Sequence, residues 1–357
     1  MVLVSYQFSS YSKVVGFIVE LSHQHSELQR MRILFKVYIY IFDKRMDKKT
    51  IDRIFLLHGL GKVESVSEIE IGFTNKVYSI NDKFILKVCE DVENESRFEK
   101  EVFFYRFFAD KIPVPKIRVF DNSKKIYNKH FIIYPRIVGD NVYSKWHLLS
   151  NIQRKEVMRQ FCEIFKTITS SQYKKFLKRF KLSATFSWHD KVVQRIKHSL
   201  EAIERKQLFS SDFLDTIKRF LEANHHVLNE QKICLVYWDA HFDNILIRNN
   251  QIVGILDFER TELASIDFTL DIIKRMVDYP KKYMSEKTEK YAKNEDYSKL
   301  LEWFQEFYPD PFAFKDIYKR LDLYALAHDL DDVLLWPNSE EIKQMIAKTV
   351  RGSGASF

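Results

Sequence analysis

The sequence has little cysteine and no long apolar run. Its 357 residues include only three cysteines, Cys89, Cys162 and Cys234, and none belongs to a Cys-x-x-Cys pair. This scarcity excludes a disulfide framework and a thiolate zinc knuckle, and it favours a reducing, cytoplasmic setting. The longest apolar run, Ile33 to Phe42, is interrupted by Lys36 and is about half the ~20 residues that a membrane-spanning helix needs. We therefore expect no transmembrane helix and no membrane partner.

The glycine-rich Walker A motif is also missing, which excludes the P-loop class of kinases. We find no internal repeat and no low-complexity segment. With 46% hydrophobic and 30% charged residues, the chain is far too apolar to be disordered, and it is long enough for one large domain or two packed lobes.

The charge is unevenly distributed along the chain. Residues 1–236 hold 41 Lys and Arg against 27 Asp and Glu, whereas residues 237–357 hold 16 against 22. Such asymmetry fits an anionic ligand on one half and a cationic ligand on the other, although solvated helix faces give the same pattern. A basic run at residues 174–181 contains interleaved aromatics, but an amphipathic helix end explains it, and we expect no nucleic-acid partner.

The order of the predicted elements divides the chain into three parts. Residues 1–45 alternate short apolar and basic pieces. They are either a native extension or the product of a start codon upstream of Met46, so we assign them no function. Residues 46–138 contain a predicted helix over Lys48 to Leu60, with Ile51, Ile54, Phe55 and Leu57 on one side, then short strands and a helix over Glu95 to Phe108. Residues 139–357 are mostly helical and contain one β-hairpin, Asn244–Arg248 and Gln251–Leu256. This order predicts an α+β protein of two lobes.

The most specific stretch lies on this hairpin and on the loop before it. The sequence Tyr-Trp-Asp-Ala-His-Phe-Asp-Asn-Ile-Leu places Asp239 five residues before Asn244, and the hairpin delivers Asp257 thirteen residues after Asn244. Phosphoryl transfer from a nucleotide requires these groups: a carboxylate facing the acceptor hydroxyl, and hard oxygen ligands for Mg²⁺. Each residue alone could be an ordinary turn or cap residue, but three at this spacing favour a phosphotransferase site.

These motifs resemble the aminoglycoside phosphotransferase and choline kinase family, whose loop reads roughly His-Gly-Asp-x-His-x-x-Asn-Ile/Leu-Leu before a hairpin ending in Ile-Asp-Phe/Trp-Glu. The resemblance implies a bilobal protein-kinase-like fold, with a small β-rich N-lobe and a helical C-lobe that contains the catalytic hairpin. It also implies that Asp239 accepts or orients the substrate hydroxyl and that Asn244 and Asp257 bind Mg²⁺. His241 matches the family histidine two residues after the catalytic aspartate, and Asp267 matches an aspartate that braces the catalytic loop.

The N-terminal half provides a check that does not depend on the family. Phe98, Val102 and Tyr105 form the buried stripe of the predicted helix, and Glu101 projects from the same face. A carboxylate on a core-facing stripe is costly unless it is paired. Lys87, within the apolar strand before this helix, is the obvious partner, although an edge-strand lysine at the surface is the alternative. We therefore predict a Lys87–Glu101 ion pair.

The resemblance assigns the remaining nucleotide contacts. It implies that Lys87 contacts the α- and β-phosphates, and that Gly72, Thr74 and Asn75 belong to a phosphate-covering turn of the form Gly-x-Ser/Thr-Asn. A strand and hinge at residues 131–139, including Tyr134 and Ile137, would meet the purine of ATP or GTP. Gly139 would mark the boundary between the lobes.

One departure from the family bears on activity. The usual His-Gly before the catalytic aspartate is Tyr237-Trp238 here, and the bulky indole would alter the mouth of the acceptor site. A catalytically silent nucleotide-binding protein is therefore the main rival from another class. Retention of Lys87, Glu101 and the catalytic-loop residues argues against that rival.

The acceptor is the least constrained part of the prediction. Choline, ethanolamine, homoserine, methylthioribose and amino-sugar kinases share these motifs. Acidic residues of the second half favour a cationic, aminoglycoside-like acceptor because carboxylates make charge-assisted hydrogen bonds to ammonium groups, although ordinary surface acids are the alternative. The candidates for this role are Glu259, Glu262, Asp329, Asp331 and Asp332.

Overall fold

The computed structural model describes residues 46–69, 75–90, 92–182 and 186–351, and it separates into two compact units, residues 1–66 and 67–357. The described part of the first unit contains helix α3 (Lys48–Leu57). Asp47 caps this helix by accepting a 2.7 Å hydrogen bond from the backbone amide of Thr50. The helix is shorter than predicted because the chain leaves it at Gly59 and Gly61, which both have positive φ.

The predicted apolar side of α3 is correct at three of four positions. Ile51, Ile54 and Phe55 are buried, but Leu57 is 56% exposed. Leu57 is the last residue of the helix, whereas the prediction placed it within the helix, where the pattern of buried positions still holds.

The second unit begins within a five-stranded sheet. The strands are β1 (Val66–Ile69), β2 (Asn75–Ile80), β3 (Phe84–Cys89), β4 (Val119–Asp121) and β5 (Phe131–Pro135), in the spatial order β1-β2-β3-β5-β4. A tight turn over residues 81–83 joins β2 to β3, and Asn81 and Asp82 in it both have positive φ, which these residue types tolerate. Strand β3 lies between β2 and β5, so Lys87 is on a central strand and not on an edge.

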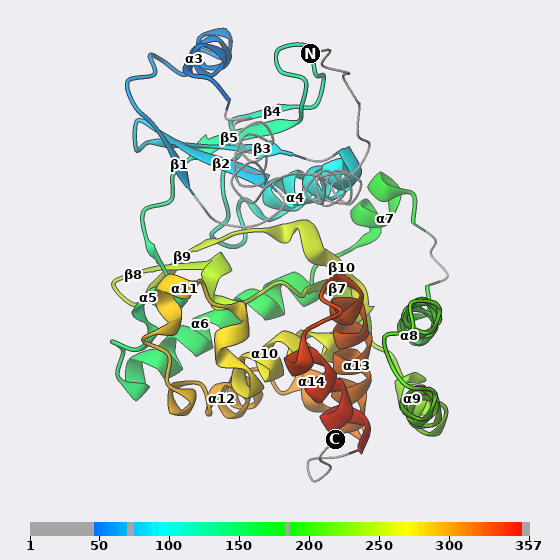
Figure 1. Cartoon of the computed structure of the whole chain (residues 1–357). Coiled ribbons are helices and arrows are strands. Elements are labelled where there is room, and N and C mark those ends of the chain that lie inside the picture. Colours follow the sequence, from blue (N-terminus) through cyan, green and yellow to red (C-terminus); the bar gives the residue numbers. More distant parts are fainter. Residues whose placement is uncertain (1–45, 70–74, 91, 183–185, 352–357) are drawn as a thin grey trace, which may run out of the picture. The chain divides into compact units, whose positions relative to one another are not determined.

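Helix α4 (Glu95–Phe108) lies between β3 and β4 in the chain and beside the sheet in Figure 1. Its buried residues include Phe98, Glu101, Val102 and Tyr105, which is the stripe that the periodicity predicted. The sheet and α4 occupy one end of residues 67–357, and most of the helices occupy the other (Figure 1). The mixed α+β, two-lobed arrangement predicted from the order of elements is therefore present.

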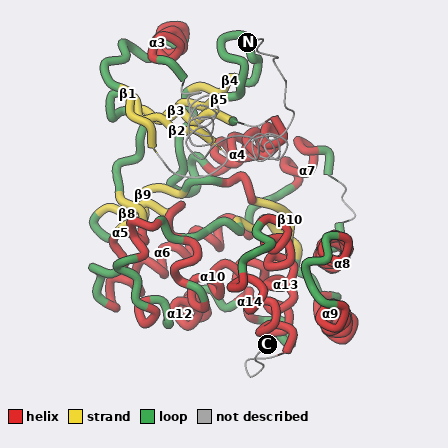
Figure 2. Tube along the Cα trace, viewed as in Figure 1, coloured by secondary structure: helices red, strands yellow, loops and turns green. Residues whose placement is uncertain are grey.

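Helices dominate the rest of this unit (Figure 2). The basic run at residues 174–181 contains α7 (Lys174–Phe180), whose Phe176 and Phe180 rings lie within about 6 Å of the Phe103 ring on α4, so these aromatic side chains serve packing. Ten helices follow the sheet: α5 (Val142–Trp146), α6 (Asn151–Thr169), α7 (Lys174–Phe180), α8 (Trp188–Arg205), α9 (Ser211–Asn224), α10 (Thr269–Asp278), α11 (Glu286–Glu289), α12 (Leu300–Phe307), α13 (Ile317–Leu335) and α14 (Glu340–Arg351), counting α-helices of the described residues after β5.

Two small antiparallel sheets lie among these helices. The predicted hairpin is β8 (Ile245–Arg248) and β9 (Gln251–Ile255), joined at Asn249 and Asn250, and the short β6 (Asp140–Asn141) extends it. Strand β7 (Ile233–Tyr237) precedes this hairpin in the chain and strand β10 (Thr261–Ser265) follows it, and the two strands pair with each other. The pairing of β7 with β10 holds the segments before and after the hairpin in place. These two segments carry the predicted catalytic residues Asp239 and Asp257.

Gly139 lies against this hairpin. A Cβ atom at Gly139 would be 2.9 Å from Val253 Cγ2 and 3.0 Å from the carbonyl oxygen of Ile247, so only glycine fits here without displacement. We keep residue 138 as the proposed end of the first lobe. Among the described residues, no helix is long and apolar enough to cross a membrane.

Candidate active site

The predicted ion pair between Lys87 and Glu101 is present. Lys87 Nζ lies 2.9 Å and 2.7 Å from the two carboxylate oxygens of Glu101, and both residues are buried. Burial alone would lower the pKa of Lys87, but the carboxylates of Asp257 and Glu101 raise it above its usual value. Lys87 is therefore a positive charge in the core, paired with Glu101 and close to Asp257.

Tyr105 connects this pair to the segment after the hairpin. Its hydroxyl donates a 2.6 Å hydrogen bond to Glu101 and accepts a 2.9 Å hydrogen bond from the backbone amide of Asp257. Asp257 has a left-handed backbone, with φ 59°, which is uncommon for a residue other than glycine. Its side-chain Oδ1 lies 3.7 Å from Lys87 Nζ. The sequence analysis placed Tyr105 only on the buried stripe, and its spacing of i+4 from Glu101 was the signal for this contact.

Three carboxylates converge beside Lys87. Oxygens of Glu101, Asp257 and Glu259 lie within 4.8 Å of one another, and Oδ1 of Asp257 is buried without a hydrogen-bond partner among the described residues. Burial and the nearby charge of Asp257 raise the pKa of Glu259. Hard carboxylate oxygens with an unused acceptor are the donor set that Mg²⁺ prefers, so these residues fit the implied metal ion. Glu259, predicted to contact the acceptor, lies in this cluster.

The loop with the predicted catalytic aspartate is closed by Asn244. The Asn244 side-chain amide donates a 2.9 Å hydrogen bond to the backbone carbonyl of Asp239 and lies 3.2 Å from Nε2 of His241. His241 Nε2 is in turn 3.7 Å from Oδ1 of Asp239, and burial lowers the pKa of His241. His241 therefore packs against both residues as a neutral ring, which supports the loop.

Asp239 is positioned to titrate near neutrality. Burial raises its pKa to about 6; the charge of Asp257 adds to this effect, while the charges of Arg260 and Lys87 oppose it. A carboxylate of this basicity, ionised at neutral pH, can accept a proton from a hydroxyl group.

The two residues that depart from the family pattern are both fixed by buried contacts. The Tyr237 ring stacks on Phe258 with centroids 4.5 Å apart, and its hydroxyl donates to the carbonyl oxygen of Leu256. Trp238 is 4% exposed and donates a 2.7 Å hydrogen bond from Nε1 to Asp271 on α10. The sequence analysis missed Asp271, which is 33 residues away from its partner in the chain.

Asp267, which the resemblance assigns to bracing the catalytic loop, makes its side-chain contacts with α13. It is fully buried, and it accepts hydrogen bonds from Arg320 at 2.7 Å and 3.0 Å and from the Tyr324 hydroxyl at 2.7 Å. Both partners lie on α13, so Asp267 ties the segment after β10 to that helix. Asp271 is bonded to Trp238, the residue directly before Asp239.

The other acids predicted to contact the acceptor have basic partners. Asp329, Asp331 and Asp332 lie on α13, and Glu262 lies on β10. Their nearest cations are Lys191 for Glu262, Arg275 for Asp329 at 2.9 Å, Arg195 for Asp331 at 2.7 Å, and Lys282 for Asp332 at 2.9 Å. Each of the four carboxylates therefore has a basic partner within the protein.

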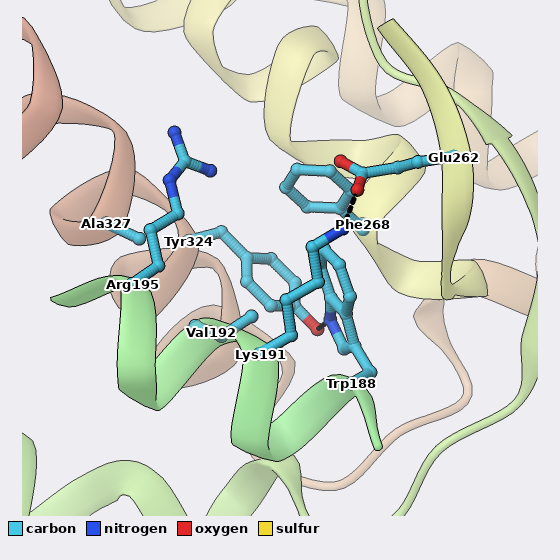
Figure 3. Close-up of a pocket in the computed structure, with 8 residues that line it drawn as sticks. All are labelled: Trp188, Lys191, Val192, Arg195, Glu262, Phe268, Tyr324 and Ala327. Carbon is cyan, nitrogen blue, oxygen red and sulfur yellow. Dashed lines mark hydrogen bonds and ion pairs between the residues drawn. The ribbon is translucent and has the colours of Figure 1, made fainter. Parts of the chain in front are cut away.

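A small pocket between α8, β10 and α13 shows this pairing (Figure 3). Its lower part is aromatic, with Trp188 and Tyr324 joined by a 3.0 Å hydrogen bond between the indole Nε1 and the hydroxyl. Lys191 extends across the pocket to Glu262 (Figure 3). Both members of this ion pair line the pocket.

Some predicted nucleotide contacts cannot be compared with the structure. Gly72 and Thr74 lie outside the described residues, and Asn75 is the first residue of β2. Tyr134 is buried on β5, with its ring 6.2 Å from that of Tyr105, and Ile137 is half-buried beside Gly254. The predicted purine-binding roles of these residues stay predictions.

The fold and this cluster together define the kinase-like class of enzymes: a sheet lysine paired with a helix glutamate, next to two aspartates on either side of a hairpin. Residues 65–270 match the model of the phosphotransferase enzyme family, and the chain belongs to this family. Membership implies a nucleotide co-substrate with Mg²⁺.

Solved structures show the same fold. APH(2")-IIa in a ternary complex with streptomycin and ATP is 18% identical, with a TM-score of 0.64 over 86% of this chain and 97% of that chain. The aminoglycoside phosphotransferase APH(2'')-Ib with bound ADP is 19% identical, with a TM-score of 0.63 over 86% and 97%. A thermostable mutant of APH(4)-Ia with ADP and hygromycin B is 14% identical, with a TM-score of 0.60 over 85% and 99%. No curated protein sequence matches the chain.

Proposed function

We propose that the chain transfers the terminal phosphoryl group of ATP or GTP to a hydroxyl group of a small molecule, with Mg²⁺ bound. The observation that carries this proposal is the buried cluster in which Lys87 contacts Glu101 and lies 3.7 Å from Asp257. In this assignment Lys87 binds the α- and β-phosphate oxygens, and Glu101 keeps its ammonium group in place.

Asp239 would receive the proton of the acceptor hydroxyl. The bond between the acceptor oxygen and the γ-phosphorus forms while the bond from that phosphorus to the β-phosphate oxygen breaks, which releases ADP or GDP. Asp257, Asn244 and Glu259 would hold Mg²⁺, which neutralises phosphate charge when it is bound. Most of the rate enhancement in such a reaction comes from positioning and charge neutralisation.

The acceptor is a narrower question. Some of the solved relatives bind streptomycin, gentamicin, kanamycin or hygromycin B, but at 14–20% identity their likeness extends to the fold alone. The prediction of a cationic amino-sugar acceptor was based on five acidic residues. Four of them are paired with basic residues, which removes much of the support for that prediction. Choline, ethanolamine, homoserine and other sugar hydroxyls therefore remain alternatives.

The test is acceptor-dependent release of ADP or GDP from the purified chain, measured over a panel of cationic, neutral and anionic hydroxyl compounds. Product should carry phosphate from the labelled γ-position, and Asp239→Asn should abolish it. Tight nucleotide binding without transfer to any acceptor would instead favour the catalytically silent rival.

A further inference from the structure

The residue that replaces the family glycine forms a fixed platform. Trp238 is buried, its indole nitrogen bonds Asp271, and its ring lies 4.6 Å from the His328 ring and 6.3 Å from the Phe268 ring. Contacts on several sides hold an indole in one orientation. The platform directly precedes Asp239 in the chain, so whatever rests on it lies beside the predicted acceptor site.

Arg260 rests on this platform. Its guanidinium carbon is 5.4 Å from the centroid of the Trp238 ring, which is within cation–π range. Arg260 is exposed, and it makes no ion pair with any carboxylate in the described ranges of the chain. A guanidinium group that is held in place by stacking has unused donors in a planar fork, which suits carboxylate and phosphate groups.

The absence of a partner distinguishes Arg260 from the other cations around it. Burial is the largest cause of the lowered pKa of His328, and the positive charges of four basic residues lower it further. Three of them already have a carboxylate partner on α13, in the pairs Arg275–Asp329, Arg195–Asp331 and Lys282–Asp332, and the fourth is Arg260.

Arg260 lies over Trp238, the residue directly before the predicted base Asp239. Its charge is the largest electrostatic influence on Asp239, and it also acts on His241 and on Glu259, its neighbour in the chain. The leading charges on Lys87 are instead those of Asp257, Glu101 and Tyr134, which surround the predicted phosphate site. Arg260 is therefore placed to contact the molecule that receives the phosphoryl group.

We propose that Arg260 binds an anionic group of the acceptor, a carboxylate or a phosphate ester, and that the physiological acceptor is an anionic hydroxyl compound. This inference rests on the proposed phosphotransferase function and specifies its substrate class. It predicts the opposite preference from the one that the acidic residues of the sequence suggested, because four of those five acids have a basic partner and Arg260 has no carboxylate partner among the described residues.

The test uses four sugars that differ in one charged group: glucose, glucosamine, glucuronate and glucose 6-phosphate. We expect the full chain to phosphorylate the two anionic sugars with the highest kcat/KM, and glucuronate against glucose 6-phosphate shows whether a carboxylate or a phosphate ester is preferred. In Arg260→Gln the KM for anionic sugars should rise about 10- to 100-fold with kcat little changed, since a hydrogen bond to a charged group is lost. Arg260→Lys should restore part of this loss.

The matched control is Arg106→Gln, which removes another exposed arginine that lies over an aromatic ring, 5.8 Å from Phe120. This control should keep the wild-type KM for every sugar. A preference for glucosamine, an equal loss with all four sugars, or a fall in kcat alone would overturn the proposal. The last two results would place Arg260 at the transferred phosphoryl group.

Direct binding separates this inference from the proposed function. Calorimetric titration of glucuronate and glucose 6-phosphate into the chain saturated with Mg²⁺ and a non-hydrolysable ATP analogue requires no turnover. Binding that weakens at least tenfold in Arg260→Gln, in a chain that transfers no phosphate, would refute the proposed function and support the anion site. Transfer to a sugar with anion binding unchanged in Arg260→Gln would refute the anion site alone.

Discussion

The hydroxyl of Tyr105 and the backbone amide of Asp257 are joined by a 2.9 Å hydrogen bond. The two residues are 152 positions apart in the chain. The same hydroxyl bonds Glu101, so the orientation of α4 and the conformation of the segment after the hairpin depend on one oxygen atom. In consequence, the lysine–glutamate pair and the predicted metal ligand Asp257 cannot be displaced independently.

Replacing Tyr105 by phenylalanine should expose this dependence. The buried Glu101 carboxylate and the Asp257 amide would each lose a partner, so we expect the free energy of unfolding to fall by about 1–3 kcal/mol. Affinity for Mg²⁺·ATP should fall as well, because Asp257 is no longer held. Denaturant unfolding and calorimetry measure the two effects. Tyr318→Phe, at an exposed position on α13, is the control and should change neither.

Asp239→Asn should reduce turnover about 10²- to 10⁴-fold with nucleotide affinity nearly unchanged, since the asparagine cannot accept the proton. Steady-state turnover and nucleotide titration of the same sample measure both quantities. Asp310→Asn, which removes an exposed carboxylate paired with Lys232, is the control. A variant that retains more than about a tenth of the wild-type turnover would show that Asp239 is not the base.

The pH dependence should follow the same carboxylate. Because the pKa of Asp239 is raised to about 6 by burial, its active ionised form is lost as the pH falls through 6, and kcat/KM should fall with it. The positive charge of Arg260 opposes this increase in the pKa of Asp239. In Arg260→Gln the pKa of Asp239 should therefore rise further, which moves the acidic limb of the profile to higher pH. An acidic limb near pH 4 in the wild-type chain, the range of an ordinary aspartate, would contradict this assignment.

Asp257→Ala should remove the metal-dependent part of nucleotide affinity. The variant lacks the carboxylate with the unused buried oxygen, so ATP should bind equally weakly with Mg²⁺ and with EDTA. Glu259→Gln should retain part of the difference, because it leaves an oxygen ligand in place. Calorimetry with and without Mg²⁺ makes the comparison, and an unchanged response to Mg²⁺ in Asp257→Ala would exclude Asp257 as a ligand.

The buried pair between Asp267 and Arg320 should matter for stability. Both side chains are fully buried, so Asp267→Asn leaves an uncompensated guanidinium in the core, and we expect a loss of about 3–5 kcal/mol. Asp310→Asn, at an exposed ion pair, should cost less than about 1 kcal/mol. Equal losses in chemical denaturation of the two variants would contradict this reasoning.

Local patterns were enough to predict several of these features. The 3.6-residue period of α4 placed Glu101 in the core, where an unpaired carboxylate is too costly, and Lys87 followed as its partner. The turns at Asn81–Asp82 and Asn249–Asn250 were predictable because asparagine and aspartate tolerate the positive φ that tight hairpins require. In each case the information lies within a few residues of the feature.

The features that the sequence analysis missed depend on distant parts of the chain. Trp238 and Asp271 are 33 residues apart, and no periodicity connects a loop to a helix that follows a different strand. The basic partners of the acidic residues were missed for the same reason. Counting acids along the chain showed Asp329 and its neighbours but not Arg275, which folding places 2.9 Å away.

The three cysteines have a practical consequence for the study of folding. All are buried, on β3, α6 and β7, and burial raises the pKa of Cys162 and Cys234 to about 12. Because the thiolate is the reactive form, these thiols should resist alkylation in the folded chain and react only when their surroundings open. Cys89 would report opening of the sheet, and Cys162 and Cys234 opening of the helical part. Their relative labelling rates would show whether the two lobes unfold as one cooperative unit or in sequence.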